Sequence, residues 1–215
     1  DVTVLRRVFA ISCWTMMQLF LALSVWFIFF IAVEHLGERP LAVVNLVRSL
    51  SAIPFIILNS FATAGSSLVS NLIGAGHSDQ VLKLIRRTAG LAFIGSGAFL
   101  VIFALFPNPI LRIFTDSAVL IDATRETMYA IVINTMIQTG AYIVYNAVSG
   151  TGNTRVALLI ELIATVVYGV AIYIVVIVLR SSVALCWLCD STYALTIGLA
   201  SFLYLWSGRW KNRRV

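Results

Sequence analysis

Polar side chains recur at helical spacing along one long apolar segment, residues 127–148, and directly after it. They step along the chain by four, four, three and four positions, and they are Asn134, Gln138, Tyr142, Tyr145 and Ser149. This spacing keeps them within one stripe of a helix. Amide groups beside aromatic rings suit an amphipathic or cationic ligand, because the rings attract cations and the amides form hydrogen bonds. The stripe therefore predicts one wall of a hydrated cavity.

A second stripe lies in residues 41–73, where Arg48 and Asn59 are about three helical turns apart. Its predicted cavity residues are Asn45, Asn59 and Thr63. The alternative is that Ser, Thr and Asn only let helices approach closely and hydrogen-bond each other, which is the better explanation for any single serine. For the two stripes as wholes we favour a cavity, because tyrosine beside Gln and Asn is bulkier than helix packing requires.

Four charged residues are candidates for coupling or gating, namely Glu34, Arg48, Glu161 and Asp190. Arg48 lies about 12 Å into the membrane region, counted from the turn at Pro40 at about 1.5 Å per residue. That depth calls for a partner, which is either Glu34 or Asp190. Such a pair either staples two helices near the outer face or takes part in gating or coupling.

Glu161 shares a helical face with Thr165 and Tyr168, a few residues in from Arg155. It is either a proton site within the membrane or a side chain that reaches the interface and pairs with a basic residue there. No group of His, Cys and carboxylates converges as a metal site, and no cofactor is predicted. No nucleophile, base and orienting group share a helical face, which argues against an intramembrane enzyme.

The segments that must position these side chains are transmembrane helices. Sixty per cent of the 215 residues are apolar, 11% are charged and the mean hydropathy is +0.99. Soluble domains are roughly 45–50% apolar and about 25% charged. We predict an all-α, polytopic six-transmembrane-helix bundle, because the apolar runs are long enough to need the core of a bilayer. The expected spans are residues 8–33, 41–73, 84–106, 127–148, 156–179 and 184–205.

The basic residues lie at the ends of the apolar runs, as membrane anchors do, which argues against nucleic acid as a partner. One side of the membrane collects ten of them, Arg6, Arg7, Lys83, Arg86, Arg87, Arg155, Arg209, Lys211, Arg213 and Arg214. The other side has four, Arg39, Arg112, Arg125 and Arg180. The asymmetry predicts that both termini are cytoplasmic, with a basic tail over residues 206–215. The expected location is a plasma (inner) membrane, bacterial in type.

The connections carry helix breakers. The turns at residues 74–79 and 149–153 each contain Gly-x-Gly, but neither follows a strand, so they are helix-end turns and not phosphate loops. The one long connection, residues 107–126, holds an apolar patch expected to lie along the membrane interface. The second span is too long to cross a bilayer upright and is expected to protrude, tilt or bend, with Pro54 as the natural kink.

Three stretches give the chain a resemblance to a known family. They are WFIFFIAVEHLGERPLAVVN at residues 26–45, SNLIGAGHSDQ at 70–80 and AVSGTGNTRVA at 147–157. The glycine turns follow the second and fourth helices of a six-helix lobe, and FTDSAVLIDAT at 114–124 is similar to a long external loop. Together they resemble the C-terminal half of a multidrug and toxic compound extrusion (MATE) transporter, over nearly the whole chain.

That resemblance implies a twelve-helix antiporter whose two lobes enclose an alternately accessible cavity. It would expel amphipathic, often cationic, small molecules in exchange for Na⁺ or H⁺. The implied partners are the lipid bilayer and either the N-terminal six-helix lobe of the same transporter or a second copy. Related transporters often place carboxylates in the first and fourth helices of this lobe, where this chain has Gln18 as the nearest polar residue and Gln138. A neutral amide cannot exchange a proton, so coupling would rest on the other lobe or on Glu34, Glu161 or Asp190.

Two other functions stay open. A flippase for lipid-linked sugars, from the same superfamily, would need a more basic cavity than Arg48 alone provides. A membrane assembly subunit without transport activity is the second. Replacing Gln138, Tyr142 and Arg48 in a full-length parent would separate them, because unchanged drug efflux in all three variants would count against a cavity.

Overall fold

The chain folds into long helices joined by short connections. The computed structural model describes the backbone of residues 2–210 and the side chains of Phe9 and residues 12–210. The long helices are α1 (Val2–Glu34), α2 (Glu38–Gly74), α3 (Val81–Leu105), α5 (Ala118–Gly150), α6 (Thr154–Ile172) and α7 (Val183–Trp206). The short ones are η1 (Ser78–Gln80), α4 (Pro107–Phe114) and the π-helical η2 (Tyr173–Val178). No strand occurs in the described backbone, and six helical segments can cross a membrane, so the predicted all-α six-helix bundle is confirmed.

The outer surface of these helices is apolar. Phe20, Ile94 and Val166 are 70%, 74% and 65% exposed, on three different helices. Water would make such exposure costly, whereas hydrocarbon accepts it, and a helix satisfies its own backbone hydrogen bonds within the bilayer. The chain is a multi-pass membrane protein.

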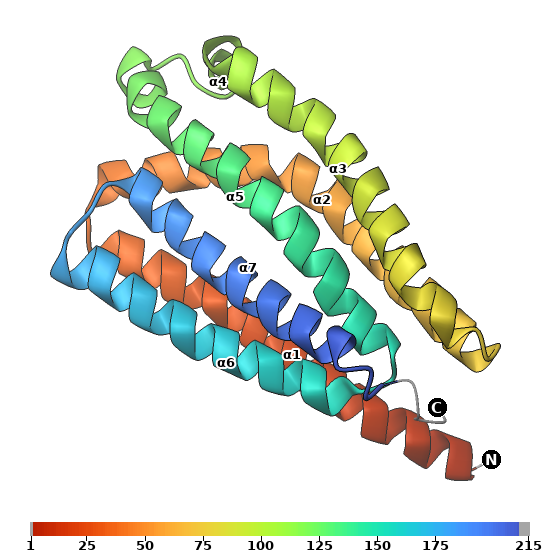
Figure 1. Cartoon of the computed structure of the whole chain (residues 1–215). Helices are drawn as coiled ribbons and strands as arrows, with labels where there is room; N and C mark the ends of the chain where they lie inside the picture. The colour runs from red at the N-terminus through yellow and green to blue at the C-terminus, as the bar shows by residue number, and fades with distance from the viewer. Residues whose placement is uncertain (1, 211–215) are drawn as a thin grey trace.

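The helices pack in an order that differs from their order in the chain. α1 packs on α6, α6 on α7 and α7 on α5, while α5 also contacts α2 and α3 (Figure 1). α1 and α2 are consecutive, yet they diverge from the turn that joins them. The divergence opens a space between α1 and the first half of α2, with α5 and α7 behind it, and this arrangement positions the candidate site.

α2 bends along its length, as the sequence predicts, with Pro54 buried near its middle (Figure 1). Arg48, before Pro54, lies over the Phe30 ring of α1, whereas Gly65, after it, lies against Thr88 of α3. The Ser70 hydroxyl, also after Pro54, donates a hydrogen bond of 2.7 Å to the carbonyl oxygen of Gly150 in α5. The bend lets one helix serve both the core of the bundle and the wall of a cavity.

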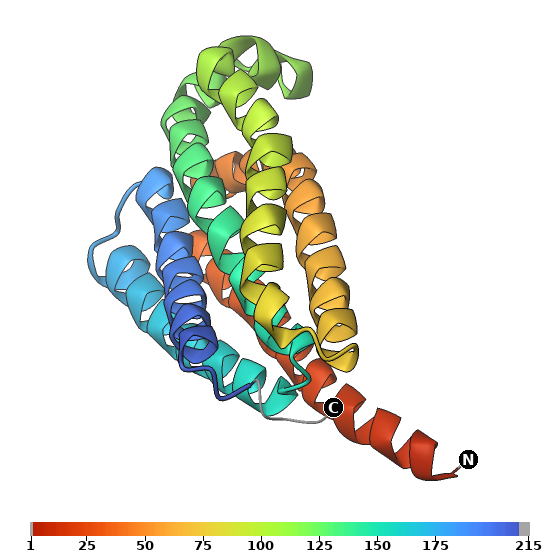
Figure 2. The same ribbon diagram turned by 45° about the vertical axis from the view of Figure 1, so that its right-hand side comes forward.

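The connection is shorter than predicted, because residues 107–114 form α4 at one end of the bundle (Figure 2) and residues 118–126 are already part of α5. Leu111 is fully buried and Ile113 is 79% exposed, so α4 has one face on the bundle and one face outward. Ser117 then caps α5 by accepting a hydrogen bond from the Leu120 amide at 3.4 Å. The position of α4 along a membrane interface stays a prediction.

Two glycines shape the part of the fold that carries the site. Gly152 has a φ of +77° in the turn between α5 and α6, a conformation that favours glycine. Gly198 lies where α7 crosses α5, and a Cβ added there would be 2.9 Å from the Cβ of Ala141. The missing side chain lets α7 approach α5 closely, and this approach brings polar groups of the two helices into contact.

Candidate functional site

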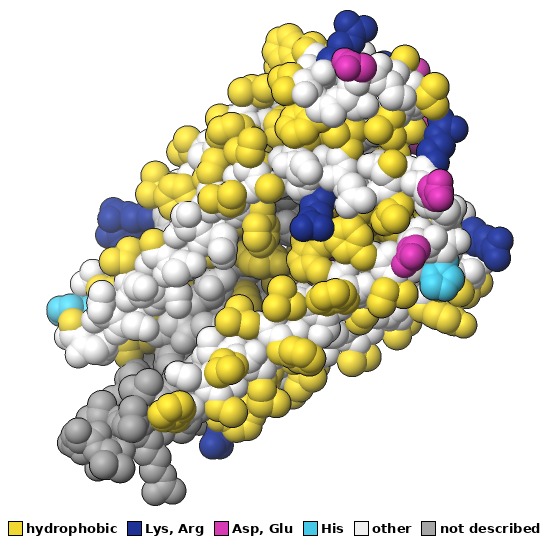
Figure 3. All heavy atoms as spheres, turned by 180° about the vertical axis from the view of Figure 1, so that it is seen from behind, with side chains coloured by type: hydrophobic (Ala, Val, Ile, Leu, Met, Phe, Trp, Pro, Cys, Tyr) yellow, Lys and Arg dark blue, Asp and Glu magenta, His cyan; other side chains and the backbone are white. Residues whose placement is uncertain are grey.

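A cavity lies between the diverging helices α1 and α2, with α5 and α7 as its back wall. Its volume is about 640 Å³, within the range of sites that hold drug-sized ligands. Figure 3 shows a hollow in the surface seen from behind, surrounded by hydrophobic side chains, with one basic side chain at its edge. All four helices contribute side chains to the wall, so the cavity exists only in the folded bundle.

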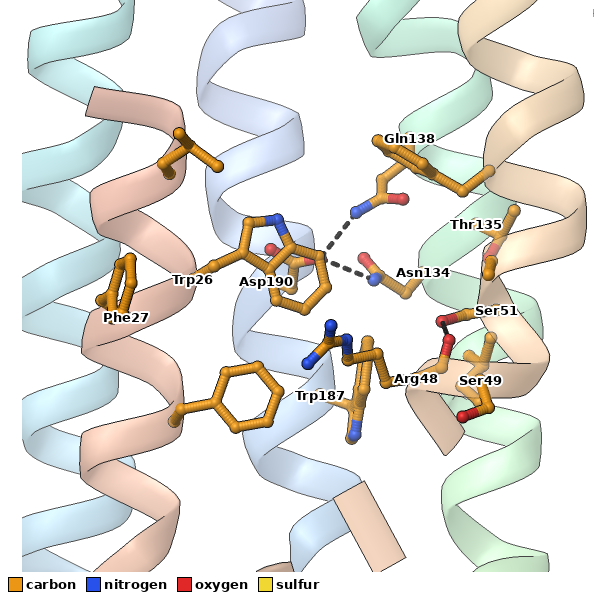
Figure 4. Close-up of a pocket in the computed structure, with 15 residues that line it drawn as sticks. Trp26, Phe27, Arg48, Ser49, Ser51, Asn134, Thr135, Gln138, Trp187 and Asp190 are labelled. Atoms are coloured by element: carbon orange, nitrogen blue, oxygen red, sulfur yellow. Dashed lines mark hydrogen bonds between the residues drawn. The ribbon is translucent and has the colours of Figure 1, made fainter. Parts of the chain in front are cut away.

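A carboxylate lies at the back of this cavity. Asp190 of α7 accepts hydrogen bonds from Nε2 of Gln138 at 2.6 Å and from Nδ2 of Asn134 at 2.9 Å (Figure 4). The two amides are one turn apart on α5, so one face of α5 presents both. The Ser191 hydroxyl donates to Oδ1 of Asn134 at 3.0 Å, which turns the amide nitrogen of Asn134 toward Asp190. These bonds fix the carboxylate in position.

Both amides bind the same carboxylate oxygen, Oδ2. The other oxygen, Oδ1, accepts no hydrogen bond from any residue that the structure describes. Because Asp190 lines the cavity, a positively charged group of a ligand can reach the open acceptor. The arrangement is suited to binding an organic cation, a metal cation or a proton.

The facing wall carries a basic residue and aromatic rings. The Arg48 guanidinium lies 5.3 Å from the ring centroid of Phe30, a cation–π contact. The ion pair that the sequence led us to expect is wrong, because no carboxylate among the described residues lies within 4.0 Å of Arg48. Glu34 is exposed at the end of α1, and Asp190 is held on α7 by the amides of α5. Phe30 takes the place of the expected carboxylate.

Two tryptophans continue the aromatic surface. Trp26 of α1 and Trp187 of α7 meet edge to face, with ring centroids 6.2 Å apart, and both line the cavity. Trp26 and Asp190 line the same cavity, and Figure 4 shows the Arg48 guanidinium reaching into it. The cavity thus combines an aromatic wall with one acidic and one basic side chain.

A second carboxyl group lies in a closed part of the bundle. Glu161 of α6 is 1% exposed, and its Oε1 accepts a hydrogen bond from the Tyr193 hydroxyl of α7. The Tyr145 hydroxyl accepts a hydrogen bond of 2.5 Å from Nε2 of Gln18 and donates one of 3.4 Å to the carbonyl oxygen of Ala157, one turn before Glu161 on α6. We call Glu161, Tyr193, Tyr145 and Gln18 the tyrosine network. Glu161 is buried and forms no ion pair with a basic side chain among the described residues, so the pairing that the sequence offered for it is not observed, and its role as a proton site stays a prediction.

The structure divides the residues of the two predicted stripes. From the α5 stripe, Asn134 and Gln138 line the cavity, whereas Tyr142 packs edge to face on Phe55 and Tyr145 belongs to the tyrosine network. From the α2 stripe, Asn45, Asn59 and Thr63 are exposed but do not line this cavity, and Arg48 does. A role of these three residues in binding stays a prediction.

Sequence reasoning missed the aromatic wall. Trp26, Phe27 and Phe30 occupy one side of α1, and Trp187 is one turn from Asp190 on α7. The spacing of Trp187 and Asp190 was the available signal, since residues three apart share a helical face. The aromatic residues of α1 gave no such signal, because a sequence does not distinguish rings that face lipid from rings that face a cavity.

Comparisons with known proteins agree on one family. A family model described as MatE matches residues 15–179. The chain is 28% identical over 174 residues to a probable multidrug resistance protein NorM of Thermotoga maritima, and the match covers 79% of this chain and 36% of that protein.

Two solved structures are similar in fold. A crystal structure of MATE in the bent conformation aligns with a TM-score of 0.81 at 15% identity, covering 94% of this chain and 45% of that one. An outward-facing multidrug resistance MATE family transporter aligns with a TM-score of 0.80 at 16% identity, covering 93% and 44%. This chain therefore spans less than half the length of the proteins it matches. Since the family model covers most of its residues, the chain belongs to the MATE family.

Proposed function

We propose that this chain is one six-helix lobe of a secondary active transporter that exports amphipathic or cationic compounds by cation-coupled antiport. The observation that carries the proposal is the fixed Asp190 carboxylate, which has an open oxygen in a cavity of about 640 Å³. A similar protein described as a probable multidrug resistance protein supports the same class of substrate.

Exchange follows if the exported cationic compound and the coupling cation compete for one carboxylate. Asp190 binds either the positively charged group of the exported compound or the coupling ion, Na⁺ or H⁺, and each displaces the other. Gln138 and Asn134 hold the carboxylate in place for both, and the tryptophans contact the apolar body of the compound. Alternating access would present this cavity to each side of the membrane in turn.

A second lobe would complete the cavity on the side where α1 and α2 diverge. It is either an N-terminal six-helix lobe of the same transporter or a second copy of this one, packed in the lipid bilayer. The cytoplasmic position of both termini, predicted from the Lys and Arg asymmetry, stays a prediction.

Transport in liposomes tests the proposal. The protein as its gene encodes it is reconstituted, and the flux of tetramethylrhodamine methyl ester, a cationic dye, is measured under an imposed Na⁺ or pH gradient. Removing a charge that contacts a ligand costs about 2–5 kcal/mol, so Asp190→Asn should slow gradient-driven flux at least about tenfold. Asp79→Asn makes the same chemical change at an exposed position in η1 and should leave the flux unchanged. A wild-type rate in Asp190→Asn contradicts the proposal.

A further inference from the structure

The cavity holds two opposite charges that do not neutralise each other. Arg48 and Asp190 both line it, yet no nitrogen of Arg48 is within 4.0 Å of an Asp190 oxygen. Arg48 belongs to α2 and Asp190 to α7, so the two charges enter the cavity from different helices (Figure 4). A direct ion pair between them would leave no room for a ligand that joins both groups.

Each charge is held by its own neighbours. Two amides of α5 fix Asp190, and they leave its Oδ1 without a partner among the described residues. The Arg48 guanidinium is steadied by Phe30 of α1, and its N–H groups donate to no side chain or carbonyl in the described part of the chain. One acceptor and one set of donors are therefore open toward the same space.

An unpaired arginine within a membrane span is costly and usually marks a binding function. Its planar guanidinium matches a carboxylate with two parallel hydrogen bonds, which a metal cation or an organic cation cannot accept. A ligand that is only a cation would satisfy Asp190 and be repelled by Arg48. A ligand with a carboxylate at its other end would satisfy both groups.

We infer that Arg48 makes this cavity selective for aromatic zwitterions, compounds with a planar apolar body, a cationic group and a carboxylate. The cationic group binds Asp190, the carboxylate binds Arg48, and the body lies against Trp26 and Trp187. The inference rests on the proposed transport function and goes beyond it, because Arg48 becomes the residue that determines which compounds bind best.

A pair of dyes that differ in one group tests the inference. Tetramethylrhodamine free acid is a zwitterion near neutral pH, and its methyl ester has the same body and cationic group without the carboxylate. Binding of each dye to the purified protein, as its gene encodes it, is measured in lipid nanodiscs by fluorescence anisotropy. The wild type should bind the free acid about tenfold more tightly than the ester, the effect of one charge-assisted contact.

Three variants show which residue causes the preference for the free acid over the ester. Arg48→Gln should weaken binding of the free acid about tenfold without weakening binding of the ester, so that the preference disappears, and Arg48→Lys should restore part of it. Asp190→Asn should weaken binding of both dyes. Melting temperatures of the variants show that each is folded.

The outcomes separate the inference from the proposed function. Equal wild-type affinities for the two dyes, an unchanged preference in Arg48→Gln, or tighter ester binding with unchanged acid binding in that variant would each overturn the inference. Gradient-driven flux of the ester that depends on Asp190 would still support transport in those cases. Absence of such flux contradicts the proposed function, and the inference falls with it.

Discussion

Asp190 and Glu161 lie on neighbouring helices of one bundle, and each accepts hydrogen bonds from α5 or α7 side chains. Asp190 faces an open cavity, and one of its oxygens lacks a partner among the described residues. Glu161 is 1% exposed and sits in the tyrosine network, with no basic side chain of the described residues within 4.0 Å. The protein thus seals one carboxyl inside the bundle and leaves an oxygen of the other open to the cavity.

The difference arises from helix separation and not from residue type. α6 and α7 pack closely around Glu161, whereas the divergence of α1 and α2 opens the space beside Asp190. A group that no ligand can reach must find its hydrogen bonds within the protein, since an unsatisfied polar group in a dry interior is costly. Two carboxyls in one lobe therefore differ in access, one sealed and one open, and the role of Glu161 as a proton site stays a prediction.

The largest expected effect sets the two carboxyls directly against each other. Glu161→Ala leaves the buried Tyr193 hydroxyl without its acceptor and creates a cavity, which should lower the free energy of unfolding by about 2–4 kcal/mol. Asp190→Ala should change it by less than about 1 kcal/mol, because water in the open cavity can bind the released amides. Melting temperatures in a constant detergent and lipid mixture measure both.

Glu161→Gln is the control for this pair, because its amide oxygen still accepts the Tyr193 hydrogen bond. It should recover most of the stability lost in Glu161→Ala. Equal destabilisation by Glu161→Ala and Asp190→Ala would break the distinction between a sealed and an open site.

A change in the spacing of α5 and α7 should affect the two regions unequally. Gly198→Ala places a methyl group 2.9 Å from the Cβ of Ala141, and overpacking of this kind costs about 1–3 kcal/mol. Binding of the cationic dye should weaken, since Gln138 and Asp190 belong to the two helices pushed apart, whereas the contact of Tyr193 with Glu161 joins α6 to α7. Gly97→Ala adds a methyl group where no atom lies within 4 Å, and it should change neither property.

The smallest expected effect concerns the support of Asp190. Ser191→Ala removes the donor that orients Asn134, and loss of one neutral hydrogen bond of about 1 kcal/mol should weaken dye binding about fivefold. Ser60→Ala removes a hydroxyl that bonds only to its own helix, at Ile56, and should have no effect on binding. Anisotropy titrations of both variants decide whether the network around Asp190 contributes to affinity.

Much of the architecture follows from the sequence because hydrocarbon imposes simple rules. Long apolar runs must form helices that satisfy their own backbone hydrogen bonds, and glycine or proline marks several of the breaks between them, so the six-helix bundle and the bend of α2 are predictable. The stripe of Asn134 and Gln138 is also predictable, since helical spacing alone puts these amides on one face.

The partners of those residues are not predictable in the same way. The sequence favoured an ion pair for Arg48 and placed Asp190 near the outer end of its helix, where it competed with Glu34. The structure pairs Arg48 with Phe30 and Asp190 with two amides more than fifty residues away in the chain. It also separates Tyr145 from Gln138, although both belong to one stripe, because the packing of α6 closes over Tyr145.

The sequence by itself determined that this chain spans a membrane, how many helices it forms and which helix faces are polar, because these properties depend on side chains within a few turns of one another. Only the tertiary structure decided which polar face meets open space and which is sealed. That choice depends on which helices pack side by side, and distant segments of the chain must meet before a carboxylate is either covered or left for a ligand.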